Sequence, residues 1–323
     1  MSHRLNKFTA SRGPLTVIDC IDCGFIHLHP LPDLAGVAEY YRSEFWQADK
    51  PRAIVTIEGQ LDWWHALWGD WLNAIEVQGL QGDKTILDIG AGFGHFVEFA
   101  ASQGWSAAGV EPNADAWRYA AKRVGLHKMH RGFLEEVTAP SAHVVSVLWV
   151  VEHLLDPAGF LADLSYRAHT LLLAVPNEWT PQQMKASAKA AVPYWWIDKT
   201  HVNYFRRADI ERLLHRNGWK IQHEMGTFPM EALILLGQDY TADSELGARL
   251  HASVRKADLA MVPLDRRLGR QRRQPHRAGW PGRPRGQRQE LPHRRGCDAR
   301  AAVAGAPPPG RRAAKDPSLG FVG

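Results

Sequence analysis

A glycine-rich turn followed by a distant acid is the feature of this sequence that points most directly to chemistry. Asp88-Ile-Gly90-Ala-Gly92-Phe-Gly94 follows an apolar run that starts at Thr85, and Glu111 stands seventeen positions after the last glycine. This order predicts a strand, a turn, a helix over 95–103 and a second strand over 106–110. Glycines let a backbone approach a ligand closely, and a carboxylate can accept both hydroxyls of a ribose. A nucleotide-like ligand is therefore expected at the carboxyl edge of a βαβ unit.

The spacing of the glycines narrows the kind of ligand. A dinucleotide fold requires G-x-G-x-x-G, and its third glycine would fall at His95. The sequence instead reads D-x-G-x-G-x-G, which resembles the first motif of class I S-adenosylmethionine-dependent methyltransferases. A glycine turn alone can be an ordinary tight corner. The apolar run on each side and the acid after the second run favour the ligand site.

Two further segments extend the resemblance. Trp149-Val-Val-Glu152-His153-Leu-Leu-Asp156-Pro157 is similar to a segment of methyltransferases related to the ubiquinone-biosynthesis and sugar methyltransferases. His201-Val-Asn-Tyr204-Phe205, with Gly218-Trp219 downstream, resembles a later segment of the same group. The three motifs occur in the family's order, and the resemblance covers roughly residues 15–240. The resemblance implies an enzyme of class EC 2.1.1.-, with S-adenosylmethionine as cofactor.

The resemblance also implies which residues hold the cofactor. The first motif would line its methionine part, Glu111 would hold the ribose, and Trp149 would close the pocket. The residues near the adenine would be those after the second and third strands. The full set is Asp88, Gly90, Ala91, Gly92, Gly94, Glu111, Pro112, Asn113, Phe133, Leu134 and Trp149.

Three residues are candidates for acid–base chemistry. A neutral hydroxyl is a poor nucleophile and needs a base, and histidine has a suitable pKa for that task. His153 follows the fourth predicted strand and His201 follows the fifth, so both could reach the mouth of the pocket. The alternatives are that His153 caps its helix or orients a loop, and that His201 only packs the insertion. Glu152 could be a base or could order the loop, and the resemblance favours the loop.

A cysteine pair near the start of the chain raises the question of a metal. Cys20-Ile-Asp-Cys23-Gly24 has the spacing of half a zinc site, but a structural zinc needs four ligands. His27 and His29 follow closely, and this spacing is cramped for a tetrahedron. The segment resembles one found before the catalytic domain of some sugar methyltransferases, which usually carry another cysteine pair upstream. No metal is predicted, with zinc on Cys20 and Cys23 as the alternative.

The remaining pattern predicts a doubly wound α/β fold with a mostly parallel, seven-stranded sheet. Residues 1–58 form an N-terminal segment, 59–263 the cofactor-binding domain, and 264–323 an Arg-, Pro- and Gly-rich tail. An amphipathic helix over 60–78 precedes the first strand. Further strands are expected at 128–130, 144–150, 170–175, 219–223 and 233–236, and further helices at 113–123, 156–168 and 208–217.

The charge of the chain is divided unevenly. Its net charge is +5, but residues 265–323 hold 14 Arg and one Lys against four acids, which leaves an acidic body. Such a tail cannot bury enough apolar surface to order itself, and it is expected to be disordered or frameshifted. No apolar run long enough for a membrane span and no signal peptide are found, and the three cysteines suit a reducing compartment, so the cytoplasm is expected.

The predicted function is methyl transfer to an oxygen or carbon of a small-molecule or sugar-bearing acceptor. Tyr194-Trp195-Trp196 could stack against a sugar, or could be a lid packed on the sheet. One alternative is an NAD-dependent oxidoreductase, against which the glycine spacing counts. The other is a nucleic-acid-binding protein acting through its tail, which has no interleaved aromatic residues and no motif for this. The sequence gives neither the acceptor nor the oligomeric state.

Overall fold

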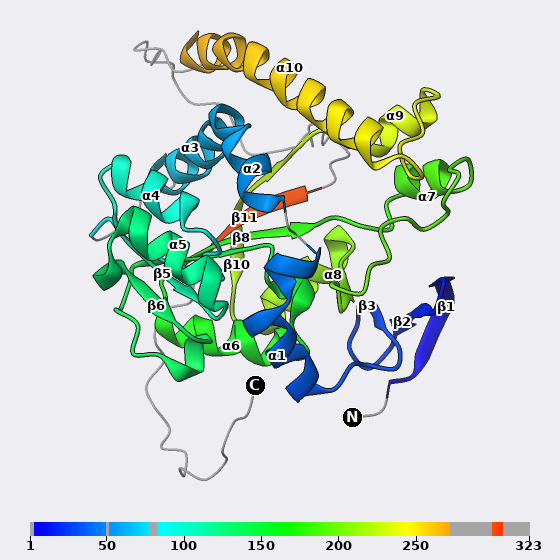
Figure 1. Ribbon diagram of the computed structural model, residues 1–323, viewed down its shortest axis with the longest axis horizontal. Helices are drawn as coiled ribbons and strands as arrows, with labels where there is room; N and C mark the ends of the chain where they lie inside the picture. The colour runs from blue at the N-terminus through cyan, green and yellow to red at the C-terminus, as the bar shows by residue number, and fades with distance from the viewer. Residues whose placement is uncertain (1–2, 50–51, 78–82, 272–298, 306–323) are drawn as a thin grey trace, which may run out of the picture.

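A twisted sheet with helices on both faces forms the body of the molecule, and a smaller sheet lies at one side (Figure 1). The computed structural model describes residues 3–49, 52–77, 83–271 and 299–305. The large sheet has seven strands in the order β10-β11-β8-β7-β4-β5-β6. This is the doubly wound α/β architecture that the alternation of strands and helices predicts.

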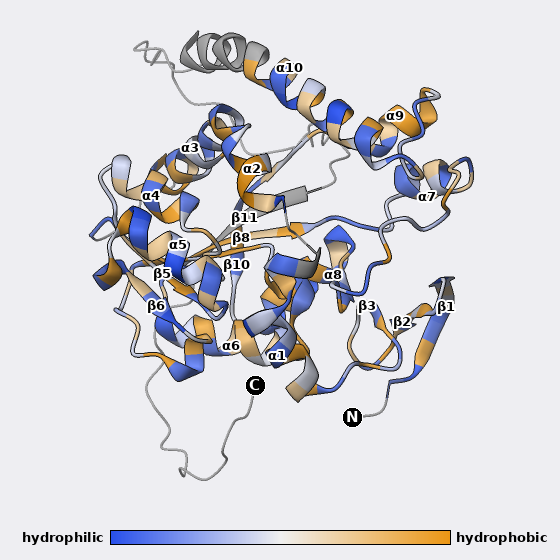
Figure 2. Cartoon of the chain, viewed as in Figure 1, coloured by the Kyte–Doolittle hydropathy of each residue, from blue (hydrophilic) through white to orange (hydrophobic). Residues whose placement is uncertain are grey.

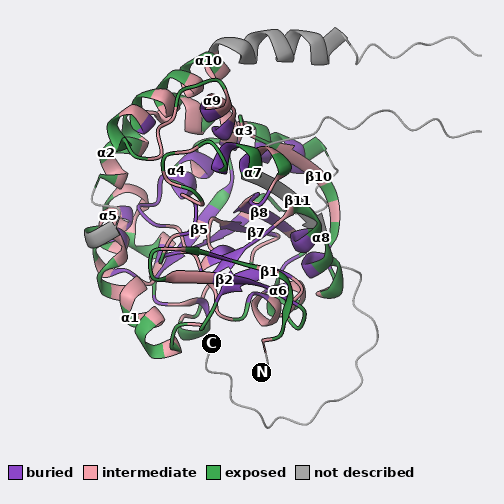
Figure 3. Ribbon diagram, turned by 90° about the vertical axis from the view of Figure 1, so that its right-hand side faces the viewer, coloured by how far each residue is buried: buried purple, intermediate pink, exposed green. Residues whose placement is uncertain are grey.

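Five neighbouring strands of the large sheet are parallel. Most side chains of the three central strands, β4, β7 and β8, are buried on both faces, which explains their largely apolar sequences. Figure 3 shows buried residues concentrated in this part of the sheet. The bounds are β4 Thr85–Ile89, β5 Ser106–Glu111, β6 Met129–Arg131, β7 Val144–Leu148 and β8 Thr170–Pro176.

The other two strands differ from the prediction. β10, Lys220–Gly226, is close to the expected strand at 219–223, but residues 233–236 belong to a helix, α9 Glu231–Leu235. The antiparallel strand is instead β11, Ala299–Gly305, which pairs with both β8 and β10. A four-residue apolar run does not distinguish a strand from a buried helical turn, and Ile234 is buried as part of such a turn.

Two described elements extend into residues 264–323, the range that the sequence assigns to the tail. The helix α10, Ser244–Gln271, continues into this range, and β11 lies within it. Residues 272–298 and 306–323 lie outside the described residues.

Helices cover both faces of the large sheet. α3 and α4 pack on one face through a tryptophan- and phenylalanine-rich cluster, and α6 and α8 pack on the other. The indole of Trp219 joins the second layer by donating to the Leu161 carbonyl at 2.8 Å. The bounds are α2 Ala53–Glu58, α3 Leu61–Val77, α4 His95–Ser102, α5 Ala114–Val124, α6 Pro157–Arg167, α7 Pro181–Ser187 and α8 Arg207–Arg216.

The N-terminal segment forms a four-stranded antiparallel sheet with a strand from the middle of the chain. Its order is β1-β2-β3-β9, with β1 Leu5–Arg12, β2 Leu15–Cys20, β3 Ile26–Leu28 and β9 Asn203–Tyr204. Trp179 and Trp196 are buried against this sheet and in contact with Tyr194. The aromatic insertion is thus packed on the small sheet, which corresponds to the packed alternative rather than to a sugar-stacking wall.

A connecting segment leads from the small sheet across the carboxyl edge of the large one. It consists of α1, Leu34–Ser43, and a π-helical turn, Phe45–Asp49. Farther along, α10 lies on α3, where the Arg255 guanidinium covers the rings of Trp63 and Trp64 at 4.4 and 4.9 Å. Hydrophilic and apolar residues alternate along the coloured part of α10 in Figure 2. Within the described residues, none of the helices combines the length and the apolar character that a membrane span requires.

Candidate active site

The glycine turn lies where β4 ends. Gly90, Gly92 and Gly94 have φ angles of 74°, 53° and 76°, a region that favours glycine. A Cβ atom on Gly90 would lie 2.5 Å from Cγ2 of Val150, so no larger residue fits there. The amides of Gly90 and Ala91 donate to the carbonyl of Val110 at 2.9 and 3.0 Å. The turn is therefore held against the end of β5.

Glu111, at the end of β5, faces this turn. Its carboxylate accepts hydrogen bonds from the amides of Gly92 and Asn113, at 2.8 and 2.9 Å. The indole of Trp46 donates to the same carboxylate. Burial raises the pKa of Glu111 to about 7, although these hydrogen bonds oppose the shift.

Asp88 is a second buried acid beside the turn. Its Oδ1 accepts a hydrogen bond from the Ser146 hydroxyl, on β7, at 2.7 Å. Burial raises the pKa of Asp88 to about 7, and the charge of Glu111 adds to the shift. The two carboxyls thus make this edge of the sheet a buried acidic site.

Asn113 has a structural task beside the same edge. Its Oδ1 caps α5 by accepting from the amides of Asp115 and Ala116, at 3.0 and 3.1 Å. Its Nδ2 donates to the carbonyls of Tyr41 and Arg42, at 3.4 and 3.1 Å. The side chain therefore fastens the end of α1 to the large sheet, and Pro112 precedes it in the loop.

Phe133 and Leu134, expected to flank the adenine, and Trp149, expected to close the pocket, lie in different surroundings. Leu134 is buried in the core with Val110, whereas the ring of Phe133 is half-buried and lies 4.7 Å from the Arg42 guanidinium. Trp149 has a φ of 56° and contacts Trp64 and Trp71 of α3, with ring centroids 5.5 and 5.8 Å apart. Phe133 thus lies at the edge, and Trp149 joins the tryptophan cluster on one face of the sheet.

A cluster of histidines and glutamates lies beyond β7 and β8. The rings of His153 and His201 meet edge to face at 5.0 Å, and His201 Nδ1 lies 3.7 Å from a carboxylate oxygen of Glu178. Nδ1 of His153 donates to the Thr200 carbonyl at 2.6 Å. Glu152, next in the chain to His153, is fully buried. The structure therefore brings the three predicted candidates together.

Glu178 was missed by the sequence analysis. It comes two residues after β8, a position where an acid reaches the carboxyl edge, but no motif singles it out. Burial raises the pKa of Glu178 and raises that of Glu152 to about 7. Burial would lower the pKa of His201, but the carboxylates of Glu178, Glu152 and Asp198 outweigh it and raise the pKa above its ordinary value. The charge of the His201 imidazole therefore depends on the charges of these neighbouring carboxyls.

The same group has the composition of a possible metal site. One ligand atom each from Glu152, His153 and His201 lie within 4.8 Å of one another. However, the Nδ1 of His153 is already engaged with Thr200, so its ring could bind a metal only through Nε2.

A groove adjoins the histidine pair. It is lined by α1 and by the residues before β9, including Tyr40, Tyr41, Lys199 and Thr200. The hydroxyl of Tyr41 donates to the Thr200 carbonyl at 2.9 Å, and the ring of Tyr41 lies 5.4 Å from that of His153. Tyr41 and Thr200 therefore line the groove and also contact His153.

Aromatic residues of the connecting segment link the glycine turn to the histidine pair. Trp46 contacts Phe93 with ring centroids 4.6 Å apart, and a Cβ on Gly92 would lie 3.1 Å from the indole. Phe45 contacts both Trp46 and His153, at 4.8 and 5.8 Å. A continuous row of rings therefore joins the two parts of the site.

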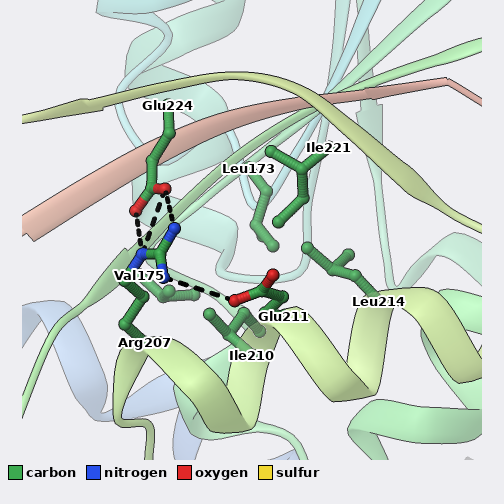
Figure 4. A pocket seen from close by; sticks show the side chains of 8 residues that line it. All are labelled: Leu173, Val175, Arg207, Ile210, Glu211, Leu214, Ile221 and Glu224. Atoms are coloured by element: carbon green, nitrogen blue, oxygen red, sulfur yellow. Dashed lines mark hydrogen bonds and ion pairs between the residues drawn. The ribbon is translucent and has the colours of Figure 1, made fainter. Parts of the chain in front are cut away.

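A small cavity lies elsewhere, between α8, β8 and β10 (Figure 4). It is lined by Leu173, Ile210 and Ile221, and an ion pair between Arg207 and Glu224, at 3.0 Å, borders it. Its apolar lining belongs to the packing between α8 and the sheet. It is separate from the glycine turn and from the histidines.

Comparison with known families decides what kind of enzyme this architecture serves. The family model described as "Methyltransferase domain" matches residues 63–224, half of the chain. The chain belongs to this family. It is an S-adenosylmethionine-dependent methyltransferase of class EC 2.1.1.-, as the glycine motif predicts. The alternative of an NAD-dependent oxidoreductase is thereby set aside.

Solved structures with a similar fold include several methyltransferases. A putative methyltransferase from Bacillus halodurans is 17% identical, with 55% of this chain and 82% of that chain covered and a TM-score of 0.41. Magnesium protoporphyrin IX methyltransferase from Synechocystis, with bound S-adenosylhomocysteine, is 16% identical, with 61% and 94% covered and a TM-score of 0.44. A plantazolicin methyltransferase is 14% identical, with 84% and 93% covered and a TM-score of 0.47. No curated protein matches this methyltransferase.

Proposed function

We propose that this methyltransferase methylates an oxygen or carbon atom of a small-molecule or sugar-bearing acceptor that binds in the groove beside Tyr40 and Tyr41. The observation that supports this most directly is the contact between His201 and the buried Glu178, next to His153 and the groove. A base held by a buried carboxylate suits an acceptor that must lose a proton.

The glycine edge is the proposed cofactor site. The turn of Gly90, Ala91, Gly92 and Gly94, with Asp88 beneath it, would hold the methionine part. Glu111 would accept the ribose hydroxyls in place of the Trp46 indole, and Phe133 would lie against the adenine. Pro112, Asn113, Leu134 and Trp149 would shape the pocket rather than supply polar contacts, because the Asn113 side chain is engaged and Leu134 is in the core.

The chemistry divides between cofactor and protein. The bound sulfonium supplies an activated methyl group, so the protein must align the acceptor in line with it and exclude water. His201 would remove the acceptor's proton at Nε2 while Glu178 fixes the ring through Nδ1. The resulting imidazolium would be stabilised by the Glu178 charge. Thus the lone pair left on the acceptor forms the new bond to the methyl carbon as the bond to sulfur breaks.

His153 and Glu152 have supporting parts in this proposal. The hydrogen bond from His153 Nδ1 to Thr200 fixes its ring against that of His201. Glu152, the residue before His153, is fully buried, and its charge contributes to the raised pKa of His201. Both are positioning residues, and His201 is the proposed catalytic base.

His201→Ala tests the proposal, with His215→Ala on the exposed side of α8 as the matched control. Methyl transfer from labelled S-adenosylmethionine would be measured on hydroxylated small molecules and nucleotide sugars, together with calorimetry of S-adenosylhomocysteine binding. We expect His201→Ala to lose turnover by about 100-fold or more while its affinity for S-adenosylhomocysteine stays unchanged. Unchanged turnover would refute the role of His201, and transfer only to protein or nucleic acid would refute the acceptor class.

A further inference from the structure

Four potential metal ligands converge at the small sheet, far along the chain from the glycine turn. They are Cys20 at the end of β2, Cys23 in the turn that follows, His27 on β3, and His3 just before β1. One ligand atom from each lies within 4.8 Å of the others. We propose that His3, Cys20, Cys23 and His27 form a tetrahedral zinc site that holds the start of β1, the cysteine turn and β3 together.

The distances fit this metal. Zinc bonds of about 2.3 Å to sulfur and about 2.0 Å to nitrogen place tetrahedral ligand atoms roughly 3.3–3.8 Å apart. His3 Nδ1 lies 3.2 Å from His27 Nε2, 3.5 Å from Cys23 Sγ and 3.9 Å from Cys20 Sγ. Two thiolates with two imidazoles are a ligand set that zinc prefers over magnesium or calcium.

The orientation of His27 supports the assignment independently. Its Nδ1 donates to the Leu28 carbonyl at 2.7 Å, which leaves the lone pair on Nε2 directed at the cluster. His27 is buried, and a buried imidazole with one nitrogen hydrogen-bonded to a carbonyl presents its other nitrogen in a fixed direction, as metal-binding histidines do.

The turn around the two cysteines is also shaped for ligation. The amide of Cys23 donates to Cys20 Sγ at 3.5 Å, and the amide of Gly24 donates to the Cys20 carbonyl at 2.9 Å. Gly24 has a φ of 81°, which closes the turn.

His3 is held in place by its neighbour. The Arg4 amide donates to the Asp22 carboxylate at 2.8 Å, and the amide of Ile21 donates to the Arg4 carbonyl at 2.9 Å. These bonds fasten the start of β1 to the cysteine turn and bring His3 over it. His29, the histidine that the spacing also offers, is exposed and is not part of the cluster.

The proposed zinc site is connected to the loop that carries Glu152 and His153 through β9. His27 pairs in register with Asn203 on β9, and the Asn203 amide donates to the carbonyls of Val151 and Leu154, at 3.2 and 2.6 Å. These two residues flank Glu152 and His153. A metal on His27 would therefore stabilise the strand that holds this loop.

Metal analysis of untagged, full-length protein, purified in reducing buffer without chelators, tests the proposal. We expect about one zinc per chain in the wild type. Cys23→Ala and His3→Ala should each lower zinc affinity by more than about tenfold, since changes outside the first ligand shell already cost that much. His29→Ala is the matched control and should keep its zinc.

Two further measurements keep the test decisive if a cysteine variant folds poorly. S-adenosylhomocysteine binding reports whether the methyltransferase domain is folded in each variant. Cobalt replacement should give a thiolate-to-cobalt charge-transfer band that weakens in Cys23→Ala and persists in His29→Ala. A folded wild type without zinc or with a Cys20–Cys23 disulfide, or zinc retained equally in Cys23→Ala and His3→Ala, would overturn the site.

Discussion

The indole of Trp46 hydrogen-bonds the carboxylate of Glu111, the acid at the end of β5. The tryptophan comes from the connecting segment, outside the sheet that carries Glu111. Its ring also lies against Phe93 and covers Gly92. The N-terminal part of the chain thus supplies a side chain to the edge where the cofactor is proposed to bind.

Trp46→Phe should therefore bind S-adenosylhomocysteine more tightly. The phenyl ring keeps the contact with Phe93. In the variant, however, Glu111 has no hydrogen bond from an indole to give up before it accepts one from a ribose hydroxyl. Because a hydrogen bond to a charged group contributes about 1.5–3 kcal/mol, partly regained from water, we expect a gain of up to about tenfold. Calorimetry measures it, with Trp63→Phe on α3 as control. Weaker binding would mean that the indole holds the ligand instead.

Glu111→Gln should change how stability depends on pH. The pKa of Glu111 is about 7 in the folded protein and near 4.3 when unfolded, so the folded state binds the extra proton between these values. Glu111 therefore lowers the free energy of unfolding increasingly as pH rises from about 4.3 to 7, and this loss stays constant at higher pH. The melting temperature of Glu111→Gln relative to wild type should rise over this window. A constant difference would contradict the shifted pKa.

Glu178→Gln should separate positioning from catalysis. Without the carboxylate, burial dominates and the pKa of His201 falls below its wild-type value. The acid limb of the kcat/KM profile should shift to lower pH, with a lower maximal kcat because the ring is no longer fixed. Glu211→Gln, an exposed acid on α8, should leave the profile unchanged. If Glu178 were only structural, the limb would not move.

Asn113→Ala should destabilise the connecting segment together with α5. The variant removes a helix cap, for which about 1–2 kcal/mol is typical, and leaves the carbonyls of Tyr41 and Arg42 without their donor. Urea denaturation should show a loss of about 2 kcal/mol or more. Asn73→Ala, at an exposed position of α3, should cost far less. An equal cost in both would argue against the anchor.

Local sequence signals were sufficient for the body of the fold. Val144–Leu148 and Thr170–Pro176 are mostly apolar, with Ser146 and Thr170 as their polar members, and Gly90 tolerates no side chain, so both the strands and the turn follow from residue type. β11 could not be predicted in this way. Its alanines and glycine have low strand propensity, and its place is set by the gap between β8 and β10.

The site was predictable only where its residues follow a strand closely or belong to a motif. His153 comes soon after β7, and His201, which lies far beyond the end of β8, stands out by its motif with Tyr204 and Phe205. The contact of His201 with Glu178 depends on the loop after β8. His3 and Trp46 carry no signal of their own. The pairing of β1 with β2, with Leu5 opposite Cys20, brings His3 near the cysteines. This register depends on the packing of the folded chain and not on local sequence.

The position of β11 bears on how the chain is made. β8 and β10 leave the ribosome well before Ala299–Gly305, yet the sheet requires that late strand between them. At about 5–20 residues per second, the nascent domain spends several seconds with the edge of β8 open to pairing with other chains. Biogenesis of this enzyme should accordingly depend on chaperones that shield that edge until translation has passed residue 305.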